Sequence, residues 1–159
     1  ATISRRTTVS VSLFHGAAPG HHPRRACWWL VLGHPAAAPA VPLFVVAGEV
    51  PTPLTATPGE GAPLWLAAEK LFGLLQAEGK GGGFLRPGLL AGAGILPGLA
   101  RAERENLRRA DALPGRPGGG TPAARLSVLQ AACAAQAAAA VAEELARLGK
   151  EADRRRQSL

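Results

Sequence analysis

The chain has 159 residues, 47% of them hydrophobic, and carries 18 Lys and Arg against 11 Asp and Glu, a formal net charge of +7. This length holds one domain of ordinary size, and the apolar fraction excludes a wholly disordered chain. Aromatic residues make up only 4%, so a core depends on a limited number of Leu, Val, Trp and Phe side chains. With 20 Gly and 14 Pro, a large share of the chain is expected in loops.

The first expected element is a β-strand over residues 2–14. Ile3, Val9, Val11 and Leu13 occupy odd positions, and Ser or Thr occupies most even ones. A period of two with β-branched residues is typical of a strand that is apolar on one face. The Gly and Pro residues that follow over 15–20 predict a turn.

Two further strands are expected over residues 25–32 and 43–46. The first of these is apolar on both faces, which predicts an inner strand of a sheet. The whole apolar stretch over 26–46 is long enough to suggest a membrane span, but Pro35, Pro39 and Pro42 interrupt it, so no membrane segment is expected. Residues 1–50 therefore predict an antiparallel β-meander, and residues 51–63 predict a Pro-rich linker.

Helical periodicity predicts helices over residues 64–78, 99–112 and 122–149. Thr121 and Pro122 form a good start for the last helix, and Gly149 is its expected C-terminal cap. Residues 64–149 are thus the helical part of the same domain, and residues 150–159 form a frayed basic tail. The expected fold is α+β: an antiparallel meander of about three strands with two or three helices packed on it, half of an αββα sandwich.

Neither a metal nor a cofactor is expected. Four His residues and Cys27 fall between residues 15 and 34, but their spacing lacks a zinc-binding knuckle, which favours exposed loop histidines. The Gly-rich stretch over 92–98 lacks the spacing of a dinucleotide-binding loop. Cys27 and Cys133 are expected as small buried side chains, which fits a reducing, cytoplasmic location.

The positive charge lies mainly in residues 1–50 and 101–159. Basic residues in the second region are interleaved with Glu and lack aromatic partners for base stacking, so nucleic-acid binding is not expected.

The order of segments resembles a known family. SRRTTVSVSL is followed by CWWLVLGHP, then by VPLFVVAGEVPTPL, by a helix with LWLAAEKL and by RAERENLRRA. This order is similar to the C-terminal half of secernin-like dipeptidases, which are N-terminal-nucleophile amide hydrolases related to choloylglycine hydrolase and penicillin acylase. The resemblance covers about residues 2–112.

The resemblance implies that the chain is the C-terminal portion of a cysteine-type amide or peptide hydrolase, acting on a small peptide or amide. In relatives, a Ser-Arg pair opens a core strand and its Arg lies beside the catalytic cysteine, which assigns a supporting catalytic role to Arg5 and a substrate-binding position to Ser4. His34 is a candidate pocket wall. The family's loop Cys, Thr or Ser positions are Ala36–Ala38 here, and the nucleophile belongs to the half that precedes this chain. The chain alone is therefore expected to be inactive.

The alternative is a non-catalytic interaction module that uses the 122–149 helix and an exposed sheet face as partner surfaces. A sheet meant to stack on another sheet exposes apolar side chains when isolated. The expected partner is the missing N-terminal half, a second chain, or a second copy in a homo-oligomer.

Overall fold

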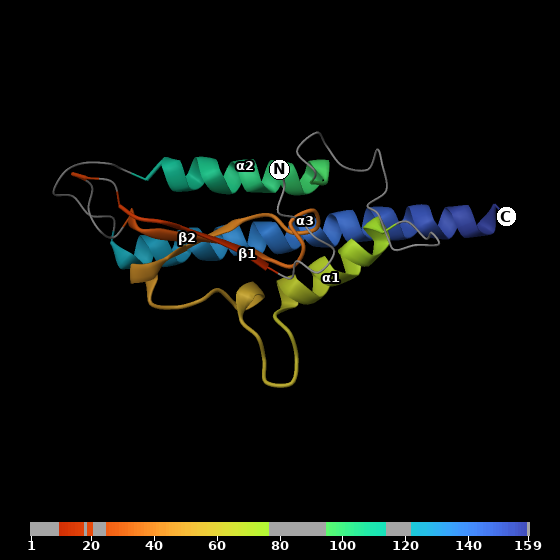
Figure 1. The fold of residues 1–159 in the computed structure, drawn as a ribbon, viewed down its shortest axis with the longest axis horizontal. Coiled ribbons are helices and arrows are strands. Elements are labelled where there is room, and N and C mark those ends of the chain that lie inside the picture. The colour runs from red at the N-terminus through yellow and green to blue at the C-terminus, as the bar shows by residue number, and fades with distance from the viewer. Residues whose placement is uncertain (1–9, 18, 21–24, 77–94, 114–121, 159) are drawn as a thin grey trace.

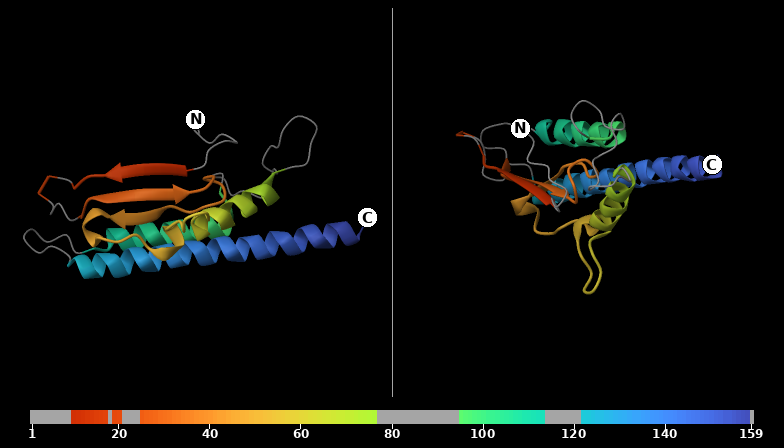
Figure 2. Two further views of the ribbon diagram at one scale, coloured as in Figure 1. Left: turned by 90° about the horizontal axis from the view of Figure 1, so that it is seen from below. Right: turned by 45° about the vertical axis from the view of Figure 1, so that its right-hand side comes forward.

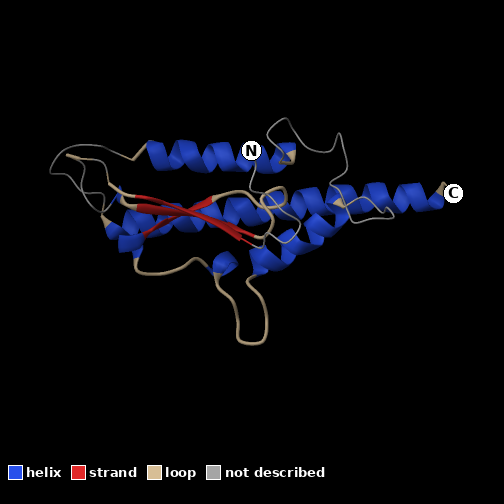
Figure 3. Cartoon of the chain, viewed as in Figure 1, coloured by secondary structure: helices blue, strands red, loops and turns tan. Residues whose placement is uncertain are grey.

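A computed structural model of the chain describes residues 10–17, 19–20, 25–76, 95–113 and 122–158. Three antiparallel strands form one sheet in the order β1-β2-β3, and three helices pack around it (Figures 1 and 3). The strands are β1 (Ser10–His15), β2 (Cys27–Leu32) and β3 (Val41–Phe44). The helices are α1 (Pro63–Leu75), α2 (Pro97–Asp111) and α3 (Ala123–Gln157). The expected α+β fold with a three-strand antiparallel meander is confirmed.

The central place of β2 confirms the prediction made from its two apolar faces. Leu13 pairs with Trp29 on one side, and Trp29 pairs with Pro42 on the other. Because side chains alternate along a strand, the register divides the sheet into two faces. The Trp28 face also holds Leu30, Leu32, Ser10, Ser12 and Phe14; the Trp29 face also holds Cys27, Val31, Val11, Leu13 and His15.

The helices gather around β3 and leave β1 outermost (Figure 2). On the Trp28 face, Leu30 and Leu32 pack against a core cluster that includes Leu64 and Leu71 of α1. On the Trp29 face, Cys27 and Trp29 belong to a smaller cluster with Ala110 at the end of α2. All four residues of β3 are buried, whereas all six residues of β1 are exposed. Burial thus decreases across the sheet from β3 to β1. Whether a second sheet completes an αββα sandwich stays a prediction.

The third strand begins earlier than the sequence predicts. It covers Val41–Phe44, and residues 45–47 form the 3₁₀ helix η2 (Val45–Ala47) instead of continuing the strand. Two side chains of α2 explain its start: the backbone N–H of Ala40 donates to Glu103 Oε2 at 3.0 Å, and Asn106 Nδ2 donates to the carbonyl of Ala40 at 2.9 Å. The end of η2 contacts α3, whose Ser127 hydroxyl donates to the carbonyl of Ala47 at 2.9 Å.

The prediction that Gly149 ends the last helix was wrong, because α3 continues to Gln157. Residues 150–157 are therefore helical, and Figure 2 shows this end extending past the sheet. Arg147 stabilises the last turns: its Nε lies 2.7 Å from Glu144 Oε2 and its NH1 lies 3.9 Å from Glu151 Oε2. Such pairs, together with good helix-forming residues, offset the cost of about 1 kcal/mol for one Gly inside a helix.

Helix α3 is also long and apolar enough to cross a membrane, with a mean hydropathy of 1.3 in its most apolar part. This is weak evidence for a membrane span, because the core helix of a soluble protein has the same length and composition. The inward stripe of α3, which includes Leu126, Cys133, Ala137 and Val141, is fully covered by the rest of the chain. One side of the helix therefore packs inside the chain, while 33% of its most apolar part is buried in all.

Candidate functional site

Strand β1 exposes three large apolar side chains. Leu13 is 65% exposed, Phe14 is 64% exposed and Val11 is 43% exposed. Among the residues that the structure describes, only β2 pairs with β1, so the backbone on its other side faces outward. An edge of this kind is a template for pairing with another strand.

Side chains on β2 extend this apolar surface inward. Phe14 lies opposite Trp28, which is itself 42% exposed. Beyond Trp28, a shallow hollow of about 290 Å³ continues along Leu43, Val45 and Val50 to Gln130. A strand added at β1 would therefore meet apolar surface on the Trp28 face as well as the side chains of β1 itself.

The edge also lacks the features that usually prevent strand pairing. Residues 10–14 read SVSLF, with no Lys, Arg, Asp, Glu or Pro. Protected edges in monomeric proteins commonly carry a charge, a Pro or a bulge at such positions. Residues 10–14 thus carry none of the side chains that usually block pairing along an edge.

The opposite edge of the sheet is closed by side chains. Gln130 of α3 is 1% exposed, and its Oε1 accepts a hydrogen bond from the backbone N–H of Phe44 at 3.0 Å. Its Nε2 donates to the carbonyl of Glu49. Glu103 and Asn106 of α2 hydrogen-bond to the backbone of Ala40. Helices α2 and α3 thus supply hydrogen-bond partners at both ends of β3. Within the described part of the chain, the sheet therefore has one closed edge and one open edge.

A cavity of about 140 Å³ lies between the β1-β2 hairpin and the end of α2. Its polar lining comes from His15, Arg25 and Asp111, and its apolar lining includes Cys27 and Trp29. His15 and Cys27 are cross-strand partners on the Trp29 face. Burial raises the pKa of the Cys27 thiol to about 11, so this thiol is protonated at neutral pH and is not an activated nucleophile.

The residues assigned from the family resemblance do not come together in the described structure. Ser4 and Arg5 lie outside the described residues. His34 is 2% exposed and stacks on Phe72 with ring centroids 4.0 Å apart. Its Nδ1 accepts a hydrogen bond from the backbone N–H of Ala36 at 3.1 Å, which stabilises the turn after β2. It lines neither of the two cavities described above, and its position is that of a core residue.

The histidines and cysteines form no metal site in the part of the chain that is described, where no group of three or more His, Cys, Asp or Glu side chains converges. His21 and His22 lie outside that part. Both cysteines are free and buried, as expected. Burial also raises the pKa of the Cys133 thiol, although Arg109 opposes the shift.

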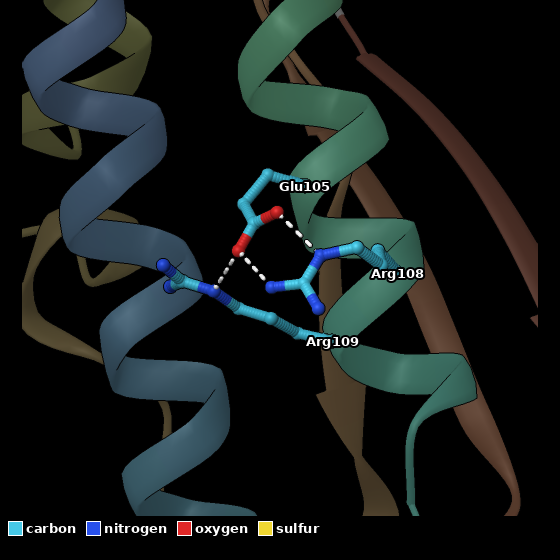
Figure 4. Close-up of polar contacts among 3 residues, drawn as sticks. All are labelled: Glu105, Arg108 and Arg109. Carbon is cyan, nitrogen blue, oxygen red and sulfur yellow. Dashed lines mark hydrogen bonds and ion pairs between the residues drawn. The ribbon is translucent and has the colours of Figure 1, made fainter.

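Three charged side chains of α2 are paired with one another (Figure 4). Glu105 Oε1 lies 2.7 Å from Arg108 NH2 and 2.8 Å from Arg109 Nε, and its Oε2 accepts from Arg108 Nε at 2.7 Å. These hydrogen bonds to Arg108 and Arg109 lower the pKa of Glu105 to about 2. Two of the arginines that contribute to the net positive charge therefore already have an acidic neighbour.

The comparisons with protein-family models, with curated proteins and with solved structures find no match to this chain. Sequence reasoning identified the strand but not its place at the edge. The feature of the sequence that points to an open edge is the lack of any charged side chain in residues 10–14 of an alternating strand.

Proposed function

We propose that this chain is a protein-interaction module that binds an extended strand of a partner along the open edge of β1. The observation that carries this proposal is the contrast between the two edges of one sheet. Gln130 closes the β3 edge through Phe44, whereas Leu13 and Phe14 stand exposed on opposite faces of the β1 edge. In strand addition, backbone hydrogen bonds supply affinity, and alternate side chains supply specificity.

The sheet edge supports this proposal better than the 122–149 helix does. The apolar stripe of α3 packs inside the chain, with Leu126, Cys133 and Val141 at most 1% exposed. A helix whose apolar face is buried in its own core presents little apolar surface to a partner. The exposed apolar side chains of β1 have no such neighbours in the described structure.

The test is binding of a labelled, capped peptide with the sequence of residues 10–15, followed by fluorescence anisotropy. Binding is expected, and a peptide N-methylated at alternate residues should not bind, because it cannot form the strand hydrogen bonds. Leu13→Lys in the protein should weaken binding at least tenfold. The matched control is Val128→Lys, since Val128 is 70% exposed but lies on α3. Equal binding of both peptides, or equal loss in both variants, would contradict strand addition at β1.

A second proposal is that the chain forms the C-terminal portion of an N-terminal-nucleophile amide hydrolase. What supports it is the order of elements: three antiparallel strands precede α1, which opens with Leu64 and Trp65, and then the Arg- and Glu-rich α2. In this proposal a preceding segment supplies the nucleophile, and Arg5 assists it. The open β1 edge is where that segment would join the sheet.

The second proposal is tested by reading the coding sequence upstream of residue 1 in the same frame. A continuous frame that supplies a Cys exposed by self-cleavage is expected, and its full product should hydrolyse dipeptides. Arg5→Ala should lower kcat/KM more than Arg5→Lys does, because Lys keeps the positive charge beside the thiolate. An interrupted frame, or a full product without hydrolysis, would refute this proposal.

Both proposals include a cytoplasmic location, which the two free, buried cysteines support.

A further inference from the structure

We infer that the strand bound at the β1 edge is β1 of a second copy of this chain, paired antiparallel about a two-fold axis. This inference rests on the proposed function and names its partner. The two three-strand sheets would then join into one six-strand sheet. Such an interface is isologous: the same surface of each copy contacts the other.

The two-fold symmetry restricts the register. An axis perpendicular to the sheet keeps each side chain on its own face, so a residue pairs only with a residue of the same face. The pairing centres on either Ser12 or Leu13. A centre at Ser12 places Val11 opposite Leu13 of the second copy, whereas a centre at Leu13 places Val11 opposite His15. The first register matches apolar with apolar side chains, so we assign the centre to Ser12.

With the centre at Ser12, each face of one sheet continues into the same face of the other sheet. On the Trp29 face, two Val11–Leu13 pairs meet, and each Leu13 is flanked by Trp29 of its own copy. On the Trp28 face, Phe14 of each copy lies opposite Ser10 of the other and beside its own Trp28. Apolar cross-strand neighbours of this kind stabilise a sheet.

The exposed surface is sufficient for a dimer. Buried aromatic side chains remove roughly 150–250 Å² each from water. Phe14 and Trp28 expose 64% and 42% of their surfaces, and Val11 and Leu13 add to this apolar area. Covering these side chains and the strand backbone in two copies would bury on the order of 1,000 Å², the lower limit for a specific interface.

The charge of the segment is compatible with a second copy and disfavours a charged strand. The chain has a formal net charge of +7, but the paired segment, residues 10–14, carries no charged side chain. Self-pairing therefore brings no like charges opposite each other along these residues, where they would destabilise the pair. An acidic or a basic peptide strand would find no complementary charge there.

The test uses two single-cysteine additions on the same face of the same strand. In Ser12→Cys, the two new cysteines lie directly opposite each other at the symmetry axis, with Cβ atoms about 4.5–5.5 Å apart. In Ser10→Cys, the control, the two new thiols lie about 13 Å apart, four residues along the strand. A disulfide needs Cβ atoms about 3.5–4.5 Å apart, within reach of a small shift only for Ser12→Cys. Cys27 and Cys133 are at most 4% exposed and do not compete.

The chain is expected to sediment as a dimer at micromolar concentration. Mild oxidation should cross-link Ser12→Cys at least tenfold faster than Ser10→Cys, and Leu13→Lys should shift the chain to monomer while Val128→Lys does not. A monomer at 100 µM, or equal cross-linking of the two cysteine variants, would overturn the inference. A monomer that still binds the residue 10–15 peptide would remove the second copy as partner but leave the proposed function standing. A dimer with no peptide binding and no effect of Leu13→Lys would refute both.

Discussion

Gln130 Oε1 accepts a hydrogen bond from the backbone N–H of Phe44 at 3.0 Å, joining the N-terminal part of α3 to the end of β3 across 86 positions of sequence. The same side chain donates from Nε2 to the carbonyl of Glu49. One amide thus satisfies two backbone groups at the edge of the sheet. The contact closes the β3 edge, and it leaves β1 as the only open edge in the described sheet.

Replacing Gln130 tests how much this closure contributes to stability. Gln130→Leu should lower the free energy of unfolding by about 1–3 kcal/mol, because the buried N–H of Phe44 and the carbonyl of Glu49 both lose their partner. Urea denaturation measures the change. Gln136→Leu, in a half-buried position on the same helix, is the control and should change stability by less than about 0.5 kcal/mol. A loss of equal size in both variants would show that the two hydrogen bonds contribute nothing specific.

Two glycines within helices should respond to Ala in opposite ways. Gly149 lies inside α3, and no neighbouring atom lies within 4 Å of the place that a Cβ would take, so Gly149→Ala should stabilise the chain by up to about 1 kcal/mol. Gly98 instead donates its N–H to Glu144 Oε1 at 3.0 Å, and an added Cβ would collide with that carboxylate. Gly98→Ala should therefore destabilise the chain. The Tm of both variants, measured by thermal unfolding, tests the two predictions. A higher Tm for Gly98→Ala would mean that the Glu144 side chain moves aside without loss of stability.

The Glu105 cluster should contribute to stability in a pH-dependent way. Its pKa falls from an ordinary 4.5 to about 2 in the folded chain, because Arg108 and Arg109 hydrogen-bond to the carboxylate. A lowered pKa stabilises the folded state above pH 4.5, and this contribution disappears as the pH falls towards 2. The Tm difference between the wild type and Glu105→Gln should shrink over this range. Glu143→Gln, at an exposed position on α3, is the control, and a pH-independent difference for Glu105→Gln would contradict the ion pairing.

The native thiols should react slowly. At pH 8, a thiol with a pKa of about 11, as for Cys27, is ionised about 100-fold less than an ordinary cysteine, and burial limits access further. Iodoacetamide should therefore label the folded chain at least about 100-fold more slowly than the chain in denaturant. Val128→Cys, at a position that is 70% exposed on α3, provides the fast internal reference. Rapid labelling of Cys27 in the folded chain would indicate an activated thiol and would favour a catalytic role for the cavity.

Local periodicity was enough to predict much of the fold. The alternation over residues 2–14 predicted a strand, and its described part forms β1, while residues 2–9 lie outside the described residues. The two apolar faces of β2 and the helical spacing of α1 and α3 also predicted the type of each element correctly. The alternation did not identify a buried side of β1, because all six of its residues are exposed. The burial of Cys27 and Cys133 follows from the same local contexts. Patterns of this kind are readable because the strand and helix periods differ.

The ends of elements and the roles of single polar residues depended on tertiary contacts. β3 begins at Val41 because Glu103 and Asn106 hold Ala40, and these residues are 63 and 66 positions away. His34 was interpreted as a pocket wall, but its imidazole lies in the core against Phe72. No local spacing encodes such contacts, because they form only when α2 and α1 pack on the sheet.

The sequence by itself therefore determined that β1 is an uncharged, alternating strand, and the tertiary structure decided that this strand lies at the open edge. At the other edge, the backbone N–H of Phe44 is satisfied by Gln130, a residue 86 positions further along the chain. Backbone hydrogen-bonding groups in a sheet must find a partner, and only the packed helices determine which of them already have one.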